Sequence, residues 1–160
     1  MSTVGIGPKL VIDIEMYKPG QDSVSKDEGE LNVAKRLMSS VVKSNKNFAD
    51  VVVYDALASN SIWLNHCKNL GIDVVARAEN NNNKRLRQVK KKVNKLEPIE
   101  VWNDEKGLEK VEVYESKFKM DNILEPLRLV KFTMKHPNKK RSQIMIVTTL
   151  TYGSVRGKTK

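Results

Sequence analysis

Short runs of β-branched and aliphatic residues punctuate the first half of the chain and predict its strands. The runs of four to eight apolar or β-branched residues that are typical of strands lie at residues 10–16, 48–55 and 72–77. The second run contains Val51, Val52 and Val53 without a polar interruption. A continuous run of this kind is typical of a strand that is covered on both faces, so we expect a central strand here.

The segments between these strands have the three- and four-residue spacing of amphipathic helices. A first helix, beginning near Glu28, is predicted from the apolar positions Leu31, Ala34, Met38, Val41 and Val42. A second helix is predicted to begin after Ser59 or Asn60, both favourable N-cap residues, and to end at Gly71. The order strand, helix, strand, helix, strand predicts an α/β fold with a mainly parallel sheet and helices on its faces.

The pattern changes after the asparagine tract at residues 80–83. Leu86, Val89, Val93 and Leu96 form one apolar stripe, which predicts a helix over residues 84–96. Further strands are predicted at residues 99–102, 111–114, 127–134 and 143–150. We therefore divide the single domain, residues 1–160, into core elements at 1–79, a basic strand-rich insertion at 80–142, and a last core strand with a tail at 143–160.

Charge is distributed unevenly between the two halves of the chain. Residues 1–80 contain 9 Lys/Arg and 10 Asp/Glu, a net charge of −1, whereas residues 81–160 contain 20 Lys/Arg and 9 Asp/Glu, a net charge of +11. One near-neutral half and one strongly basic half favour a polyanionic partner, and DNA is the partner we expect. The alternative is a lysine-rich surface that serves solubility alone.

The predicted DNA-contacting residues lie in the basic half. They are Lys84, Arg85, Arg87, Lys90, Lys91, Lys92, Lys95, Lys139, Lys140 and Arg141. The first seven occupy the polar face of the predicted helix, where they could neutralise phosphates, although an ordinary solvated helix face has the same pattern. No motif that reads base sequence is recognisable among them.

The single cysteine, Cys67, excludes a disulfide framework and favours a reducing, cytoplasmic compartment. No apolar run approaches the roughly 20 residues of a membrane span, so no membrane partner is expected. Cys67 follows His66, but adjacent helical residues point about 100° apart. We therefore interpret Cys67 as a buried small apolar residue rather than as a nucleophile.

Carboxylates are the main candidates for catalysis. Asp55 follows the three valines, at the end of a strand where sites in open α/β sheets gather, and it is either a site residue or a helix cap. Asp13 and Glu15 are two residues apart in the first predicted strand, so their side chains would share a face and could bind a divalent cation. The alternative for that pair is a solvent-facing strand end.

The order of these features resembles bacterial insertion-sequence transposases of the DDE type, close to the insertion-sequence-four group. The resemblance is carried by Val51–Leu57 (VVVYDAL), Gly71–Arg77 (GIDVVAR), Ile14-Glu15 before Pro19-Gly20, Ala34–Leu37 (AKRL), the Trp102 region and Ile146–Leu150 (IVTTL). These motifs are short, but their order and spacing cover nearly the whole chain.

The resemblance implies an RNase H-like mixed sheet flanked by helices, with a basic strand-rich insertion. It also implies that three carboxylates hold two Mg²⁺ or Mn²⁺ ions, which drive DNA cleavage and strand transfer. Asp55 matches the second acid of the family. The first acid is expected upstream of the chain, with Asp13 as the alternative, and the third is expected after residue 160.

Several expectations follow from this resemblance. The chain would be a transposase fragment that is inert alone and binds no metal tightly, with transposon ends and target DNA as partners, a nucleoid-associated location and homo-oligomerisation of the full-length protein. Two alternatives remain at this point. One is a non-catalytic nucleic-acid-binding module in which Asp55 caps a helix, and the other is a metal-dependent nuclease that uses Asp13, Glu15 and Asp55.

Overall fold

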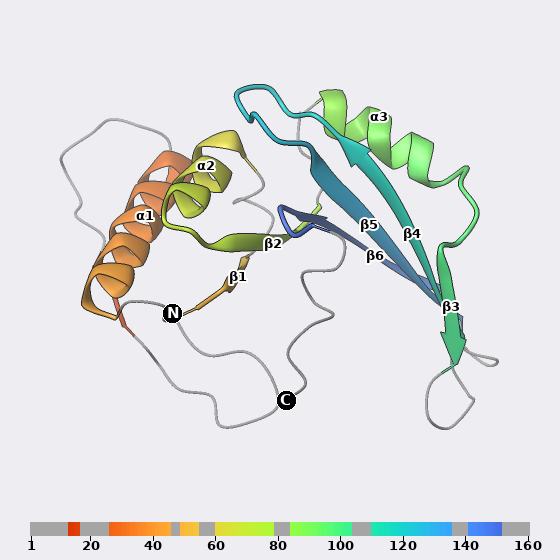
Figure 1. Ribbon diagram of the computed structural model, residues 1–160, viewed down its shortest axis with the longest axis horizontal. Coiled ribbons are helices and arrows are strands. Elements are labelled where there is room, and N and C mark those ends of the chain that lie inside the picture. The colour runs from red at the N-terminus through yellow and green to blue at the C-terminus, as the bar shows by residue number, and fades with distance from the viewer. Residues whose placement is uncertain are drawn as a thin grey trace.

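The computed structural model describes residues 13–16, 26–45, 49–54, 60–78, 84–103, 110–135 and 141–151. Three α-helices and six β-strands lie in these ranges (Figure 1). The helices are α1 (Lys26–Ser44), α2 (Ser61–Asn69) and α3 (Lys84–Val93). The strands are β1 (Val51–Tyr54), β2 (Asp73–Arg77), β3 (Glu100–Asn103), β4 (Lys110–Phe118), β5 (Leu127–Lys135) and β6 (Ser142–Thr148).

All six strands join one mixed sheet with the order β1-β2-β6-β5-β4-β3. β1 and β2, which are joined through α2, are parallel, as their order along the chain predicted. The remaining four pairings are antiparallel. The α/β class and the mixed sheet flanked by helices are therefore confirmed. The prediction of a mainly parallel sheet is wrong, because only one of the five described pairings is parallel. The sheet also unites the predicted core strands with those of the predicted insertion.

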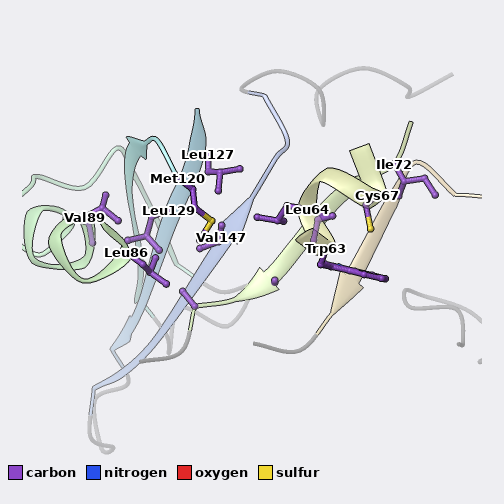
Figure 2. Packing of buried hydrophobic residues seen from close by; sticks show 14 of the residues in the cluster. Trp63, Leu64, Cys67, Ile72, Leu86, Val89, Met120, Leu127, Leu129 and Val147 are labelled. Atoms are coloured by element: carbon purple, nitrogen blue, oxygen red, sulfur yellow. The ribbon is translucent and has the colours of Figure 1, made fainter. Parts of the chain in front are cut away.

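One face of this sheet carries the buried core. Ala76, Val147 and Leu129 lie side by side on β2, β6 and β5, so their side chains point to the same face. Leu64 of α2 and Leu86 of α3 belong to the same apolar cluster as these three residues. Figure 2 shows that cluster running without interruption from α3, across β5 and β6, to α2. α2 and α3 therefore cover one and the same face.

The helices begin and pack where their sequences predict. Ala34 and Met38 of α1 are buried in the core cluster. The Asn60 side chain caps α2 by accepting a hydrogen bond from the Trp63 amide at 2.9 Å. Gly71, with a φ of +74°, follows the end of α2 in the left-handed conformation that favours glycine. Within the described ranges, no helix is long and apolar enough to cross a membrane.

Two further predictions about strands fail in the described residues. Residues 13–16 of the predicted first strand are not in a strand, and residues 10–12 lie outside the described residues. β1 lies at the edge of the described sheet instead of at its centre, and the side chains of alternate residues, Val51 and Val53, are exposed. Val51 and Val53 point away from the helices and remain 37% and 57% exposed. Three consecutive valines therefore mark a strand here without indicating its depth in the sheet.

The shared core provides a test of the fold. Leu129 of β5 is fully buried in the cluster that includes Leu86 of α3, whereas Leu124 is 99% exposed. We expect Leu129→Ala to lower the free energy of unfolding by about 2–5 kcal/mol, because the truncation leaves a cavity. The same truncation in Leu124→Ala should change it by less than about 0.5 kcal/mol. Urea unfolding followed by circular dichroism measures both, and equal losses would contradict the described packing.

Candidate nucleic-acid interface

α3 is amphipathic in a way that separates its apolar residues from its cations. Leu86, Val89 and Val93 are buried against the sheet. The exposed positions of the helix and of the turn after it carry Lys84, Arg85, Arg87, Lys91, Lys92 and Lys95. No acidic residue lies in the first turn of the helix. The outer surface of α3 is therefore strongly positive.

Two of the cations on this helix have local partners. The Lys90 ammonium donates a hydrogen bond of 2.7 Å to the Ala78 carbonyl, just after β2. This contact fastens α3 to the end of the parallel strand pair and directs Lys90 toward the protein. Arg85 lies 2.8 Å from a carboxylate oxygen of Asp121 in an exposed ion pair. An exposed pair of this kind contributes little to stability and leaves the guanidinium accessible.

A groove runs between α3 and the C-terminal end of β4. It encloses about 230 Å³, and its walls are formed by Arg85, Gln88, Val89 and Lys92 on the helix and by Lys117, Phe118 and Lys119 on the strand side. The two strand-side lysines were not among the predicted DNA-contacting residues. Their signal in the sequence is an aromatic residue between two lysines, an arrangement that suits phosphate and base contacts.

The groove is electrostatically unbalanced. Four cationic residues line it, and Asp121, through its contact with Arg85, is the acid nearby. Among the described residues, Lys92, Lys117 and Lys119 have no carboxylate within ion-pair distance. Neighbouring cations held in a concave surface raise the local concentration of anions.

Arg141, the remaining described residue of the predicted DNA-contacting set, lies in a different place. Its guanidinium is 3.6 Å from Glu112, which also lies 2.7 Å from Lys135 and 3.2 Å from Lys110. The Tyr114 hydroxyl donates a further hydrogen bond of 2.9 Å to the same carboxylate. We call these four charged residues, Glu112 with Lys110, Lys135 and Arg141, the Glu112 cluster.

The contacts of the Glu112 cluster shift the acidity of its members. The hydrogen bond from Lys135, and after it the one from Tyr114, lowers the pKa of Glu112 from 4.5 to about 2. Burial, followed by the bond to Glu112, raises the pKa of the Tyr114 phenol. Next to the cluster, burial lowers the pKa of Lys131. The Lys131 ammonium lies 3.8 Å from the centre of the Tyr114 ring and donates to Asn94 at 3.2 Å.

The predicted catalytic carboxylates are only partly described. Asp55 lies outside the described residues, as do Lys139 and Lys140. Asp13 accepts a hydrogen bond of 2.8 Å from the Ile14 amide. Glu15 lies 3.2 Å from Arg36 of α1 in an ion pair. Within the described ranges, no three His, Cys, Asp or Glu side chains lie together as they would to hold a metal ion.

Cys67 is buried, as predicted, and it is not disposed toward nucleophilic chemistry. Burial raises the pKa of its thiol to about 12, so the thiolate is scarce near neutral pH. The neighbouring His66 ring turns elsewhere: its Nε2 atom lies 3.1 Å from the Lys35 carbonyl oxygen and 3.3 Å from the Ser39 hydroxyl.

The lowered pKa of Glu112 predicts how stability depends on pH. A carboxyl whose pKa is lower in the folded state stabilises the fold above its unfolded pKa, and this contribution is lost as pH falls through the folded pKa. For Glu112 that window runs from 4.5 down to about 2. We expect Glu112→Gln to flatten this part of the acid limb in urea-denaturation midpoints measured against pH. Glu97→Gln, at an exposed position, should keep the limb of the unchanged protein, and identical limbs in all three proteins would contradict the assignment.

Comparison of the sequence with models of known protein families finds no match, and comparison with characterised proteins finds no significant similarity.

Proposed function

We propose that the groove between α3 and β4 binds the phosphate backbone of DNA, as part of a catalytic core of the DDE transposase type. The observation that carries the proposal is the convergence of cations from two separate elements on one groove. Lys92 comes from the helix, and Lys117 and Lys119 come from the end of the strand. A merely solvated helix face requires no such convergence.

The size and chemistry of the groove favour contacts to the backbone. A hollow of about 230 Å³ has room for a sugar-phosphate segment but not for a duplex. A duplex would therefore lie across the outer surface of α3, with one strand of its backbone in the groove. Lysine ammonium groups bind phosphate oxygens as point charges and release condensed counterions, which gives affinity without base recognition.

The transposase part of the proposal rests on the parallel pair β1 and β2. Asp55 directly follows Tyr54, the last residue of β1, and sites in open α/β sheets gather at the C-terminal ends of parallel strands. Asn60 fills the N-cap position of α2, so that helix does not need Asp55 as a cap. This observation favours a site role for Asp55 over the capping role. In such a core, Mg²⁺ or Mn²⁺ would supply Lewis-acid activation of the phosphodiester, and Asp55 would be one of its oxygen ligands.

Salt dependence of DNA binding tests the groove. We expect Lys92→Gln and Lys117→Gln each to reduce the slope of log affinity against log salt by about 0.9, which corresponds to a roughly eightfold weaker affinity near 0.1 M salt. Lys43→Gln, which removes the same charge from the exposed end of α1, is the matched control. Fluorescence anisotropy of a labelled duplex measures all four proteins. Equal slopes for the groove variants and the control would refute DNA binding by the groove.

A transposon-excision assay in cells tests the role of Asp55, with the reading frame that contains this chain as the source of the protein. Asp55→Asn should abolish excision, because an amide cannot replace a carboxylate that neutralises a metal ion. Asp50→Asn is the matched control, since that side chain is exposed, precedes β1 and should leave excision intact. Excision by the Asp55→Asn protein at the unchanged rate would remove Asp55 from the proposed site.

A further inference from the structure

We infer that the Glu112 cluster is a second phosphate-binding site, one that holds a phosphodiester group of the same duplex beyond the end of α3. This inference rests on the proposed function, because it assigns the groove and the cluster to one nucleic-acid ligand. Two observations that support it, the ratio of charges around Glu112 and the exposure of the cations, do not involve the groove. A third, the position of the cluster along β4, relates the cluster to the groove.

The ratio of charges separates the Glu112 cluster from a structural ion pair. On the other face of the sheet, Arg128 and Glu115 form a one-to-one pair, with both N–O distances at 2.7 Å. Those two side chains are only 15% and 11% exposed. Around Glu112, by contrast, three cations share one carboxylate. If Glu112 served only to neutralise a buried charge, one partner would suffice.

The exposure of the cluster indicates that its cations face solvent. The Glu112 side chain is 7% exposed, whereas Lys110, Lys135 and Arg141 are 49%, 43% and 46% exposed. The carboxylate therefore lies beneath three cationic groups and holds them near one another despite their mutual repulsion. Side chains ordered in advance lose less conformational entropy when a ligand binds. A net surplus of positive charge remains at the surface for an anion.

The polar layer beneath the three cations is not fully hydrogen-bonded. Thr133 lies directly across from Glu112 in the pairing of β4 with β5, and on the same face. Its hydroxyl is fully buried and has no hydrogen-bond partner in the part of the chain that the structure describes. The polar network under the cations is thus incomplete and retains one unused donor, which suits an additional acceptor.

The position of the cluster matches a ligand that also fills the groove. Phe118, which lines the groove, and Lys110 in the cluster are eight positions apart on β4, so both lie on the same face of the sheet. At a rise of about 3.4 Å per residue they are separated by roughly 27 Å. Successive base pairs of B-DNA rise by about the same 3.4 Å, so a duplex of about eight base pairs spans both sites. Figure 1 shows β4 and β5 extending past the end of α3. Lys131, which packs on the ring of Tyr114 beside the cluster, donates to Asn94 just after α3.

The decisive experiment measures binding of the labelled duplex to the whole chain. It compares two variants that change the protein's charge equally but are expected to change DNA affinity in opposite directions. Glu112→Gln and Glu97→Gln both add one positive charge to the protein. Glu97 is exposed in the turn after α3, so its loss should leave affinity unchanged or slightly higher. Loss of Glu112 should weaken binding, by roughly threefold for each cation that must be ordered anew.

Two further variants remove the cations themselves. Lys135→Gln and Arg141→Gln should each reduce the salt slope by about 0.9, and either one combined with Lys92→Gln should reduce it by about 1.8. Both side chains are nearly half exposed, and each substitution leaves Glu112 with two cations. The variants therefore test binding even if Glu112→Gln fails to fold, which thermal melting by circular dichroism would reveal.

The outcomes separate this inference from the proposed function. If Lys135→Gln and Arg141→Gln bind like Lys43→Gln while Lys92→Gln is weakened, the cluster is not a phosphate site and the groove stands. If every variant binds like Lys43→Gln, both this inference and the proposed DNA-binding role of the groove are wrong. A folded Glu112→Gln protein that gains affinity as Glu97→Gln does would overturn the role of the carboxylate. Weaker binding by all three cluster variants supports the inference.

Discussion

The structure depends on a short seam between β2 and β6. Three residue pairs join these strands, Val75–Arg77 with Ile146–Thr148, and through them the near-neutral first half of the chain meets the basic second half. Thr149 extends the seam, because its hydroxyl accepts from the Val74 amide at 2.9 Å and donates to Asp73 at 2.6 Å. The apolar row Ala76, Val147 and Leu129 lies across it, so hydrogen bonding and burial act at the same place.

The seam between β2 and β6 also fixes the position of the basic groove relative to the parallel strands. The parallel pair β1–β2 and the antiparallel strands belong to one sheet, and Lys90 ties α3 to the carbonyl just after β2. The basic groove is thereby held in a fixed relation to the parallel strands, whose C-terminal ends include Tyr54, the residue before Asp55. A nucleic-acid surface on a separate, flexibly linked module could not present a phosphodiester to a particular carboxylate, whereas one built into the same sheet can.

The sequence predicted the features that depend on residues close together in the chain, namely the helices and a helix cap. Periodicity identified the three described helices. Asn60 was one of two predicted N-cap candidates, with Ser59, and it is the residue that caps α2. The position of β1 at the edge of the described sheet could not be predicted, because three valines suit an edge strand as well as a central one, and pairing with distant residues decides between them. The Glu112 cluster was equally inaccessible: Lys110 and Arg141 are far apart in sequence, and only the pairing of β4, β5 and β6 brings them to one carboxylate.

β4 illustrates why a list of charged residues says little about their roles. Glu112 and Glu115 are both glutamates of the same strand, but they are three positions apart, an odd step, so they point to opposite faces. Glu115 meets one arginine in a shielded pair, an arrangement that satisfies both charges. Glu112 meets three cations at the rim of the sheet, where water could have solvated each of them separately. These contacts stabilise the buried carboxylate, but the three cations still repel one another. We propose that a bound anion relieves this repulsion, and the excess of positive charge in the chain favours a phosphate as that anion.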